Sequence, residues 1–287
     1  MITLNPQFST GARRAGFALA ATLLFSFTAG CGPTKVDEAS VHLKVVPPLP
    51  ADYPDQLAAN AGIKLVRLPA GSFTMGSPDG EAGRQADEGP PTRVTLTHDF
   101  YLGATAVTQG QYRAVTGSNP SEFKGDSFPV DSVSWEDAMA FCKKLTDRER
   151  AAGRLPPGWL FSLPTEAQWE YASRAGSTGA NPDGLAAMVW HDQDNGKIAH
   201  PVGRNQPNAW GLYDLHGDIM EWCYDWYGPY PGGEVTDPAG PTNGERAVLR
   251  GGGLWAGPNC RSAFRDNHST GFQDNYLGFR LALLPDR

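Results

Sequence analysis

The sequence predicts a loop-rich α+β domain. Glycine (34 residues) and proline (24 residues) are spread along the chain instead of clustering, which is typical of frequent turns. Three helix starts are nonetheless clear in the sequence. Four short runs alternate β-branched or aromatic residues with polar ones, as strands with one buried face do. Because few other windows keep a helical period, we expect much of the backbone to be irregular.

The helices are expected at about 108–116, 135–150 and 165–175. Residues 108–111 and 165–168 match the capping box, in which a hydroxyl and an amide side chain satisfy each other's backbone N–H groups. Residues 134–137 are a near match. Gly117 and Gly176 are expected to end the first and last of these helices. The strands are expected at 63–68, 93–96, 247–250 and 278–283.

The first thirty residues predict an export signal. Arg13 and Arg14 precede an uncharged stretch that is too short for a comfortable transmembrane helix. The small residues 28–30 resemble the lipobox at which bacterial lipoproteins are cleaved and acylated. We therefore expect Cys31 to be lipidated and to anchor the protein in the bacterial cell envelope, facing the periplasm or the exterior. An ordinary secretory signal is the alternative.

Residues 31–60 are expected to form a tether and residues 61–287 a single domain. The proposed tether is rich in proline and shows no sustained amphipathic period. The net charge of the chain is −7, and it becomes −9 when the two arginines of residues 1–30 are removed. A chain this acidic argues against nucleic acid as a partner, because the phosphate backbone selects basic surfaces.

Spaced motifs between residues 63 and 283 resemble the formylglycine-generating enzyme, or sulfatase-modifying factor, family. They include LPAGSFTMG at 68–76, LPTEAQWEYA at 163–172, PNAWGLYD at 207–214, LRGG at 249–252 and GFR at 278–280. The resemblance implies a fold similar to that of C-type lectins. It does not settle the function, because the same fold serves binding proteins and enzymes with other reactions.

The chain departs from this family at the positions that carry the reaction. The authentic enzyme resembles this chain around residues 250–252, but it binds copper(I) through two cysteines whose positions fall here on Ala256 and Arg261. Neither side chain is a soft sulfur ligand of the kind that copper(I) prefers. We therefore assign no catalytic residue and expect neither copper nor formylglycine formation. The neighbouring Cys260 is expected to be a buried apolar residue.

The remaining cysteines and histidines give weaker signals. The resemblance implies disulfides whose partner positions fall on Ser173 and Leu281, so no family disulfide is expected here. A bond between Cys223 and Cys260 is the one pairing retained as an alternative. Among the histidines, only His191 and His200, which flank two aspartates, are retained as an alternative metal pair.

Segment 214–221 is expected to hold a structural calcium ion. Two carboxylates and the main-chain carbonyls between them suit calcium, which takes oxygen ligands in loose geometry. The resemblance implies that Asp214 and Glu221 bind through side chains, and Gly217 and Ile219 through carbonyl groups. In the alternative interpretation, Asp214 caps a turn and Glu221 forms a salt bridge.

Two classes of function follow from these patterns. The first is an interaction module whose cleft under residues 250–265 holds a peptide, a glycan or an envelope protein. Its candidate contact residues are Trp255, Asn259, Arg265 and Asn267, since aromatic and arginine side chains are common in recognition surfaces. Trp255 and Arg265 could instead only support the loop. The second class is an oxidoreductase of the same superfamily with a different, unidentified reaction.

Overall fold

The computed structural model describes residues 47–181, 200–253 and 260–286, all of which belong to one compact unit, Val45–Arg287. The unit mixes short helices and sheets with long irregular segments, which confirms the predicted α+β class. Its helices are α1 (Tyr53–Ala61), α2 (Gln109–Thr116), α3 (Trp135–Ala151) and α4 (Glu166–Arg174), with a 3₁₀ turn at Ala86–Glu88.

The strands of the described residues form three sheets. The first has the order β1 (Leu65–Leu68), β4 (Phe100–Gly103), β11 (Ala282–Pro285), β5 (Trp159–Ser162). The second has the order β10 (Leu277–Phe279), β6 (Met220–Trp226), β8 (Arg246–Arg250), β9 (Arg265–Ser269). The third has the order β2 (Gly71–Met75), β3 (Thr92–Leu96), β7 (Gly233–Thr236).

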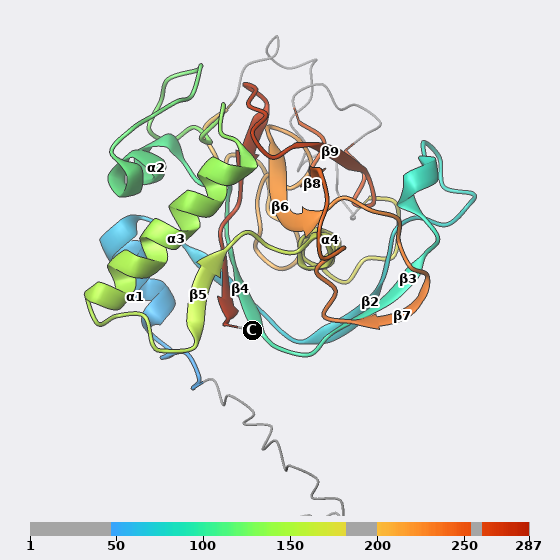
Figure 1. The fold of residues 1–287 in the computed structure, drawn as a ribbon, viewed down its shortest axis with the longest axis horizontal. Coiled ribbons are helices and arrows are strands. Elements are labelled where there is room, and N and C mark those ends of the chain that lie inside the picture. Colours follow the sequence, from blue (N-terminus) through green and yellow to red (C-terminus); the bar gives the residue numbers. More distant parts are fainter. Residues whose placement is uncertain (1–46, 182–199, 254–259, 287) are drawn as a thin grey trace, which may run out of the picture. The chain divides into compact units, whose positions relative to one another are not determined.

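The second sheet lies between the helical side and the β2-β3-β7 sheet. Figure 1 shows α1, α2 and α3 gathered beside β5, with β2, β3 and β7 on the opposite side of the unit. Helix α4 packs against β2, β6 and β8. The side chains of Trp169 on α4 and Trp222 on β6 are fully buried in two separate core clusters. Helix α4 and strand β6 carry several of the buried acids discussed below, among them Glu166 on α4 and Glu221 and Asp225 on β6.

The three predicted helix starts are confirmed. Thr108, Ser134 and Thr165 each accept a hydrogen bond from the backbone N–H three residues later, and the side chain of that later residue accepts one in return. Helix α2 ends at Gly117, whose φ of 88° is left-handed. Helix α4 ends one residue earlier than expected, at Ala175, which takes the left-handed conformation itself.

The expected strand at 278–283 is wrong in its extent. The structure has two strands there, β10 in the second sheet and β11 in the first. Arg280 lies between them and is fully buried. Its guanidinium donates to Glu221 and to the carbonyls of Gly103 and Tyr213 over 2.7 to 3.0 Å. These contacts join the two sheets, so the chain passes from one sheet to the other at Arg280.

The expected tether boundary at residue 60 is placed too late. Helix α1 lies within residues 31–60, and its Tyr53 and Leu57 are only 1% exposed in the main core. The indole N–H of Trp159 also donates to the carbonyl of Pro47 over 2.7 Å. The folded unit therefore already includes Pro47. The sequence hid this because a nine-residue helix offers too few apolar positions to show a period.

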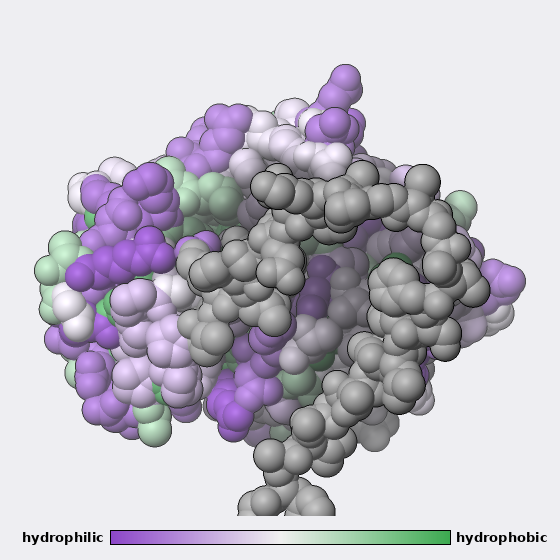
Figure 2. Space-filling model, turned by 60° about the horizontal axis from the view of Figure 1, so that its bottom comes forward, coloured by the Kyte–Doolittle hydropathy of each residue, from purple (hydrophilic) through white to green (hydrophobic). Residues whose placement is uncertain are grey.

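The described surface is largely hydrophilic. Tyr224, at 44% exposure, is the one large apolar side chain that is exposed among the described residues. On the face in Figure 2, hydrophilic residues predominate over the coloured part and the hydrophobic areas are small and scattered. Within the described ranges, none of the helices has the length and apolar character needed to cross a membrane.

Candidate functional site

Arg261 stands where the family resemblance places the second catalytic thiol, and the structure gives it a different task. Its side chain is 5% exposed. The guanidinium donates to Glu81 and Glu88 over 2.7 Å each, and to the carbonyl of Gly83 over the same distance. A second contact to Glu88 completes a two-point ion pair. Arg261 therefore ties the long loop between β2 and β3 to the chain after β8.

In this clamp, Arg261 and Glu88 each stabilise the charged form of the other. Glu88 is fully buried, and burial alone would raise its pKa. Hydrogen bonds from Arg261 and Ser77, together with the charge of Arg261, instead hold the pKa of Glu88 below its usual value. Hydrogen bonding to Glu88 in turn raises the pKa of Arg261. A permanently charged guanidinium is not a ligand for copper(I), so this residue does not fit the family's copper site.

The cysteines offer no replacement. Cys142, Cys223 and Cys260 are free thiols and all are buried, so the alternative of a Cys223–Cys260 disulfide is wrong. Burial raises the pKa of the Cys260 thiol to about 11. Because the thiolate is the form that binds metal and attacks substrates, Cys260 is inert at neutral pH. Its carbonyl accepts a hydrogen bond from Nδ1 of the buried His216, over 2.7 Å.

Arg265 is a structural residue, which corrects its expected role as a ligand contact. It is 2% exposed and makes a two-point ion pair with Glu166, at 2.8 Å for each contact. It also donates to the carbonyls of Asp87 and Gly228, and its guanidinium lies over the rings of Tyr227 and Tyr230. Arg265 lines a 280 Å³ pocket, but these internal partners already occupy its guanidinium, so the supporting role is the one that fits.

Of the other predicted contact residues, the structure describes only Asn267. Asn267 is half-buried on β9, the outermost strand of the second sheet, and its carbonyl accepts from Arg246 over 2.8 Å. Trp255 and Asn259 lie outside the described residues, as do Cys31 and His191. His200 is described, and its Nδ1 lies 3.6 Å from the carboxylate of Asp218.

The segment predicted to bind calcium contains one buried carboxylate with an oxygen that lacks a hydrogen-bond partner. Asp214 is 3% exposed, and its Oδ2 accepts from the backbone N–H of Gly203 over 2.6 Å. Its Oδ1 is buried without a hydrogen-bond partner among the described residues. Burial, reinforced by the charge of Asp218, raises the pKa of Asp214 to about 6. A cation would satisfy this oxygen and keep Asp214 ionised.

Glu221 is already satisfied within the protein. One of its oxygens accepts from Arg280 over 2.8 Å, and the other accepts from Arg280 and from the indole of Trp169. The predicted alternative of a Glu221 salt bridge is therefore present. The described residues also contain no group of three or more acidic, histidine or cysteine side chains arranged to hold a metal. A calcium ion here would rest chiefly on Asp214 and on the carbonyls of Gly217 and Ile219.

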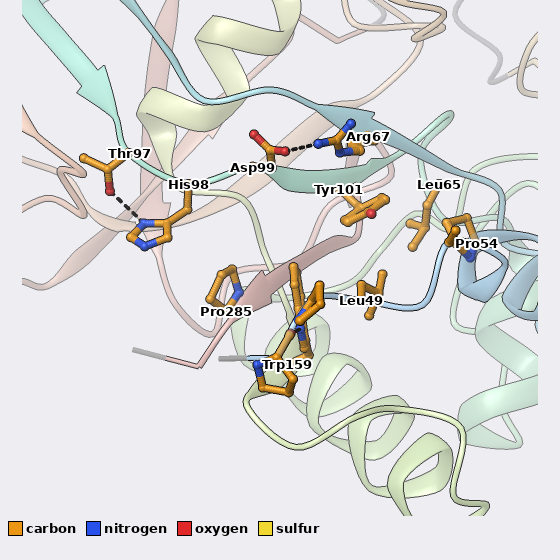
Figure 3. Close-up of a pocket in the computed structure, with 13 residues that line it drawn as sticks. Leu49, Pro54, Leu65, Arg67, Thr97, His98, Asp99, Tyr101, Trp159 and Pro285 are labelled. Atoms are coloured by element: carbon orange, nitrogen blue, oxygen red, sulfur yellow. Dashed lines mark hydrogen bonds and ion pairs between the residues drawn. The ribbon is translucent and has the colours of Figure 1, made fainter. Parts of the chain in front are cut away.

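Three pockets are lined by described residues other than Arg261. One, of 690 Å³, lies over the first sheet beside the segment from Pro47 to Pro54. In its close-up, Pro285, Trp159 and Leu49 lie between His98 on the left and Leu65 on the right, and the ion pair of Arg67 and Asp99 lies above them (Figure 3). A second, of 280 Å³, contains the buried acids Glu166 and Asp225. A third, of 460 Å³, adjoins β2 and the end of α4.

Comparisons with known proteins agree with the fold. The model of the sulfatase-modifying factor enzyme 1-like domain matches residues 51–284. The formylglycine-generating enzyme of Streptomyces coelicolor is 30% identical over 76% of this chain and 88% of its own length. Chaperone protein LppX of Paenibacillus barcinonensis is 30% identical over 56% of this chain and 70% of its own length.

Solved structures give the same picture. Treponema denticola variable protein 1 is 31% identical, with a TM-score of 0.67 over 78% of this chain and 95% of that protein. PvdO from Pseudomonas aeruginosa is also 31% identical, with a TM-score of 0.67 over 76% of this chain and 93% of that protein. The chain is thus similar both to formylglycine-generating enzymes and to proteins with other names, such as PvdO and Treponema denticola variable protein 1.

Proposed function

The chain belongs to the sulfatase-modifying factor enzyme 1-like domain family, and we propose that it is a binding module that does not make formylglycine. The observation that carries this proposal is the clamp formed by Arg261. The position that would need an exchangeable thiolate holds a buried cation, paired with Glu81 and Glu88. The one thiol beside it, Cys260, is buried and protonated at neutral pH.

The names of the relatives support the proposal that a chain of this family can have a binding role. Proteins named as formylglycine-generating enzymes and a protein named as a chaperone match the chain at about the same identity. Membership of the family is therefore compatible with a role in binding. The partner class that we propose is a peptide, a glycan or an envelope protein. Arg265 lines the 280 Å³ pocket, but its guanidinium is already paired with Glu166.

Copper(I) binding tests the proposal directly. The purified protein carrying Cys31→Ala, which removes the one cysteine outside the described residues, is titrated against a copper(I) complex of a coloured chelator. We expect the chelator to keep its copper, because the three remaining thiols are buried. A formylglycine-generating enzyme titrated in parallel serves as the positive control. Withdrawal of one equivalent of copper by the variant would contradict the proposal.

We also propose that the protein is exported and anchored to a membrane through Cys31. The small residues before Cys31 and the uncharged stretch behind them support this assignment. Radiolabelled palmitate should enter the wild-type protein in bacterial cells and should not enter the Cys31→Ala variant. Equal labelling of the two proteins would exclude lipidation at Cys31 and leave the ordinary secretory signal.

A further inference from the structure

The 460 Å³ pocket beside β2 has an aromatic wall. Phe73 on β2, Tyr171 on α4 and Trp210 all line it. The rings of Phe73 and Tyr171 have centroids 5.4 Å apart, and those of Tyr171 and Trp210 are 4.8 Å apart in an edge-to-face arrangement. Phe73 and Trp210 remain partly exposed, whereas Tyr171 is buried between them. The wall thus presents two apolar rings that are held by a third.

The rest of the pocket is rich in hydroxyl groups. Thr74, Ser177 and Thr178 line it, together with the exposed Arg93. Ser177 follows the end of α4, and its Oγ is buried without a hydrogen-bond partner among the described residues. A buried polar atom left without a partner costs free energy in the free protein. Because Ser177 lines the pocket, a rotation about its Cα–Cβ bond is enough to bring this hydroxyl to a polar ligand there.

The charge of the pocket favours an anionic ligand. The chain as a whole has 31 acidic and 24 basic residues, yet the described residues that line this pocket include two arginines and no acid. Arg174 is committed to Glu170 and to two backbone carbonyls. Arg93 has no ion pair within the described part of the chain. In the sheet it lies between Thr74 on β2 and the exposed Glu234 on β7, and no ion pair joins it to Glu234. Its guanidinium is therefore available to a carboxylate.

We propose that this pocket binds an acidic sugar, such as a uronic acid residue of a polysaccharide. The C–H face of a sugar ring packs on the partly exposed aromatic rings, and its hydroxyl groups bond to Ser177 and the neighbouring threonines. The sugar carboxylate receives the charge-assisted hydrogen bonds of Arg93. The volume of the pocket lies in the range of small-ligand sites, which combine apolar walls with a few convergent polar groups.

This inference goes beyond the proposed function, because the pocket is built from β2, β3 and the end of α4. It does not use Arg261 or the segment 250–265. The pocket can therefore bind its ligand whether or not the chain has an enzymatic activity, and the experiments on the two sites fail independently.

Calorimetric titration of the full-length protein with trigalacturonic acid tests the proposal. We expect binding that is about twofold to fivefold tighter than that of neutral maltotriose, since the ion pair of an exposed arginine contributes no more than that. Arg93→Gln should remove this preference, and Trp210→Ala should weaken both sugars. Arg113→Gln and Trp226→Ala are matched controls away from the pocket and should bind as the wild type does.

The variant Ser177→Ala separates an effect on ligand binding from an effect on stability. Because its hydroxyl has no partner in the free protein, the substitution should not lower the midpoint of urea unfolding, yet it should weaken binding of trigalacturonic acid several-fold. No heat of binding with the wild type, or unchanged affinity in both Arg93→Gln and Ser177→Ala, would overturn the proposal. If a triglutamate peptide binds and trigalacturonic acid does not, the pocket is a site for acidic peptides and the sugar assignment is wrong.

Discussion

Arg261 and Glu88 form a two-point ion pair in the interior, with side chains 5% and 0% exposed. The first belongs to the chain after β8 and the second to the loop between β2 and β3. Removing one partner of a buried pair leaves an uncompensated charge. We therefore expect Arg261→Met to lower the free energy of unfolding by about 3 kcal/mol in urea titrations.

Two further variants separate this cost from a general effect of losing an arginine. Arg113→Met removes an exposed arginine paired with Asp126 and should leave the unfolding midpoint unchanged, because such surface pairs are weak. Adding Glu88→Gln to Arg261→Met removes one of the two carboxylates left without a partner, the other being that of Glu81, and should recover part of the loss. If Arg261→Met unfolds like the wild type, the clamp does not hold the loop.

Asp225 should make stability depend on pH. It is 4% exposed, and burial, with the nearby charge of Glu166, raises its pKa to about 8. The unfolded chain gives up this proton near pH 4, while the folded protein keeps it until about pH 8. The contribution of Asp225 to the free energy of unfolding is therefore fully present below about pH 4. It is lost as the pH rises from about 4 to 8.

The variant Asp225→Asn isolates this effect, because the amide resembles the protonated carboxyl and does not titrate. Urea unfolding midpoints measured from pH 5 to 8 should fall less steeply for the variant than for the wild type. Parallel curves for the two proteins would mean that Asp225 is ionised in the fold.

Calcium should stabilise the protein through Asp214. A ligand that binds only the folded state adds about 2.7 kcal/mol at a hundredfold excess over its Kd, so chelation should lower the melting temperature. Asp214→Ala should abolish the response, and the exposed Asp126→Asn should retain it. Glu221→Gln should destabilise the protein even in chelator, since it breaks the pair with Arg280. An unchanged wild-type melting curve on chelation would count against the site.

The sequence predicts the locally encoded features best. Thr108, Ser134 and Thr165 cap their helices as expected, because a capping box needs only residues three positions apart. The clamp of Arg261 could not be predicted in this way. Its partners Glu81 and Glu88 lie 180 and 173 positions away, in a loop without a periodic pattern.

Long-range contacts also explain the other differences. The split between β10 and β11 depends on the reach of Arg280 to Glu221, 59 positions away. The same arginine could not be identified as the partner of Glu221 from the sequence, so the sequence favoured a calcium ligand and kept a salt bridge as the alternative. Arg265 shows the general difficulty, since an arginine near a cleft is a plausible contact until its internal partners are known.

The central claim is that the chain does not make formylglycine, and a turnover assay tests it most directly. The purified protein is incubated with copper(I), oxygen, a reductant and a peptide that carries the sulfatase motif Cys-x-Pro-x-Arg, with a formylglycine-generating enzyme as the positive control. Mass spectrometry should show the peptide cysteine unchanged, because Arg261 is a paired guanidinium where the reaction needs a thiolate. An aldehyde that reacts with a hydrazide probe, formed faster than without protein, would contradict the account.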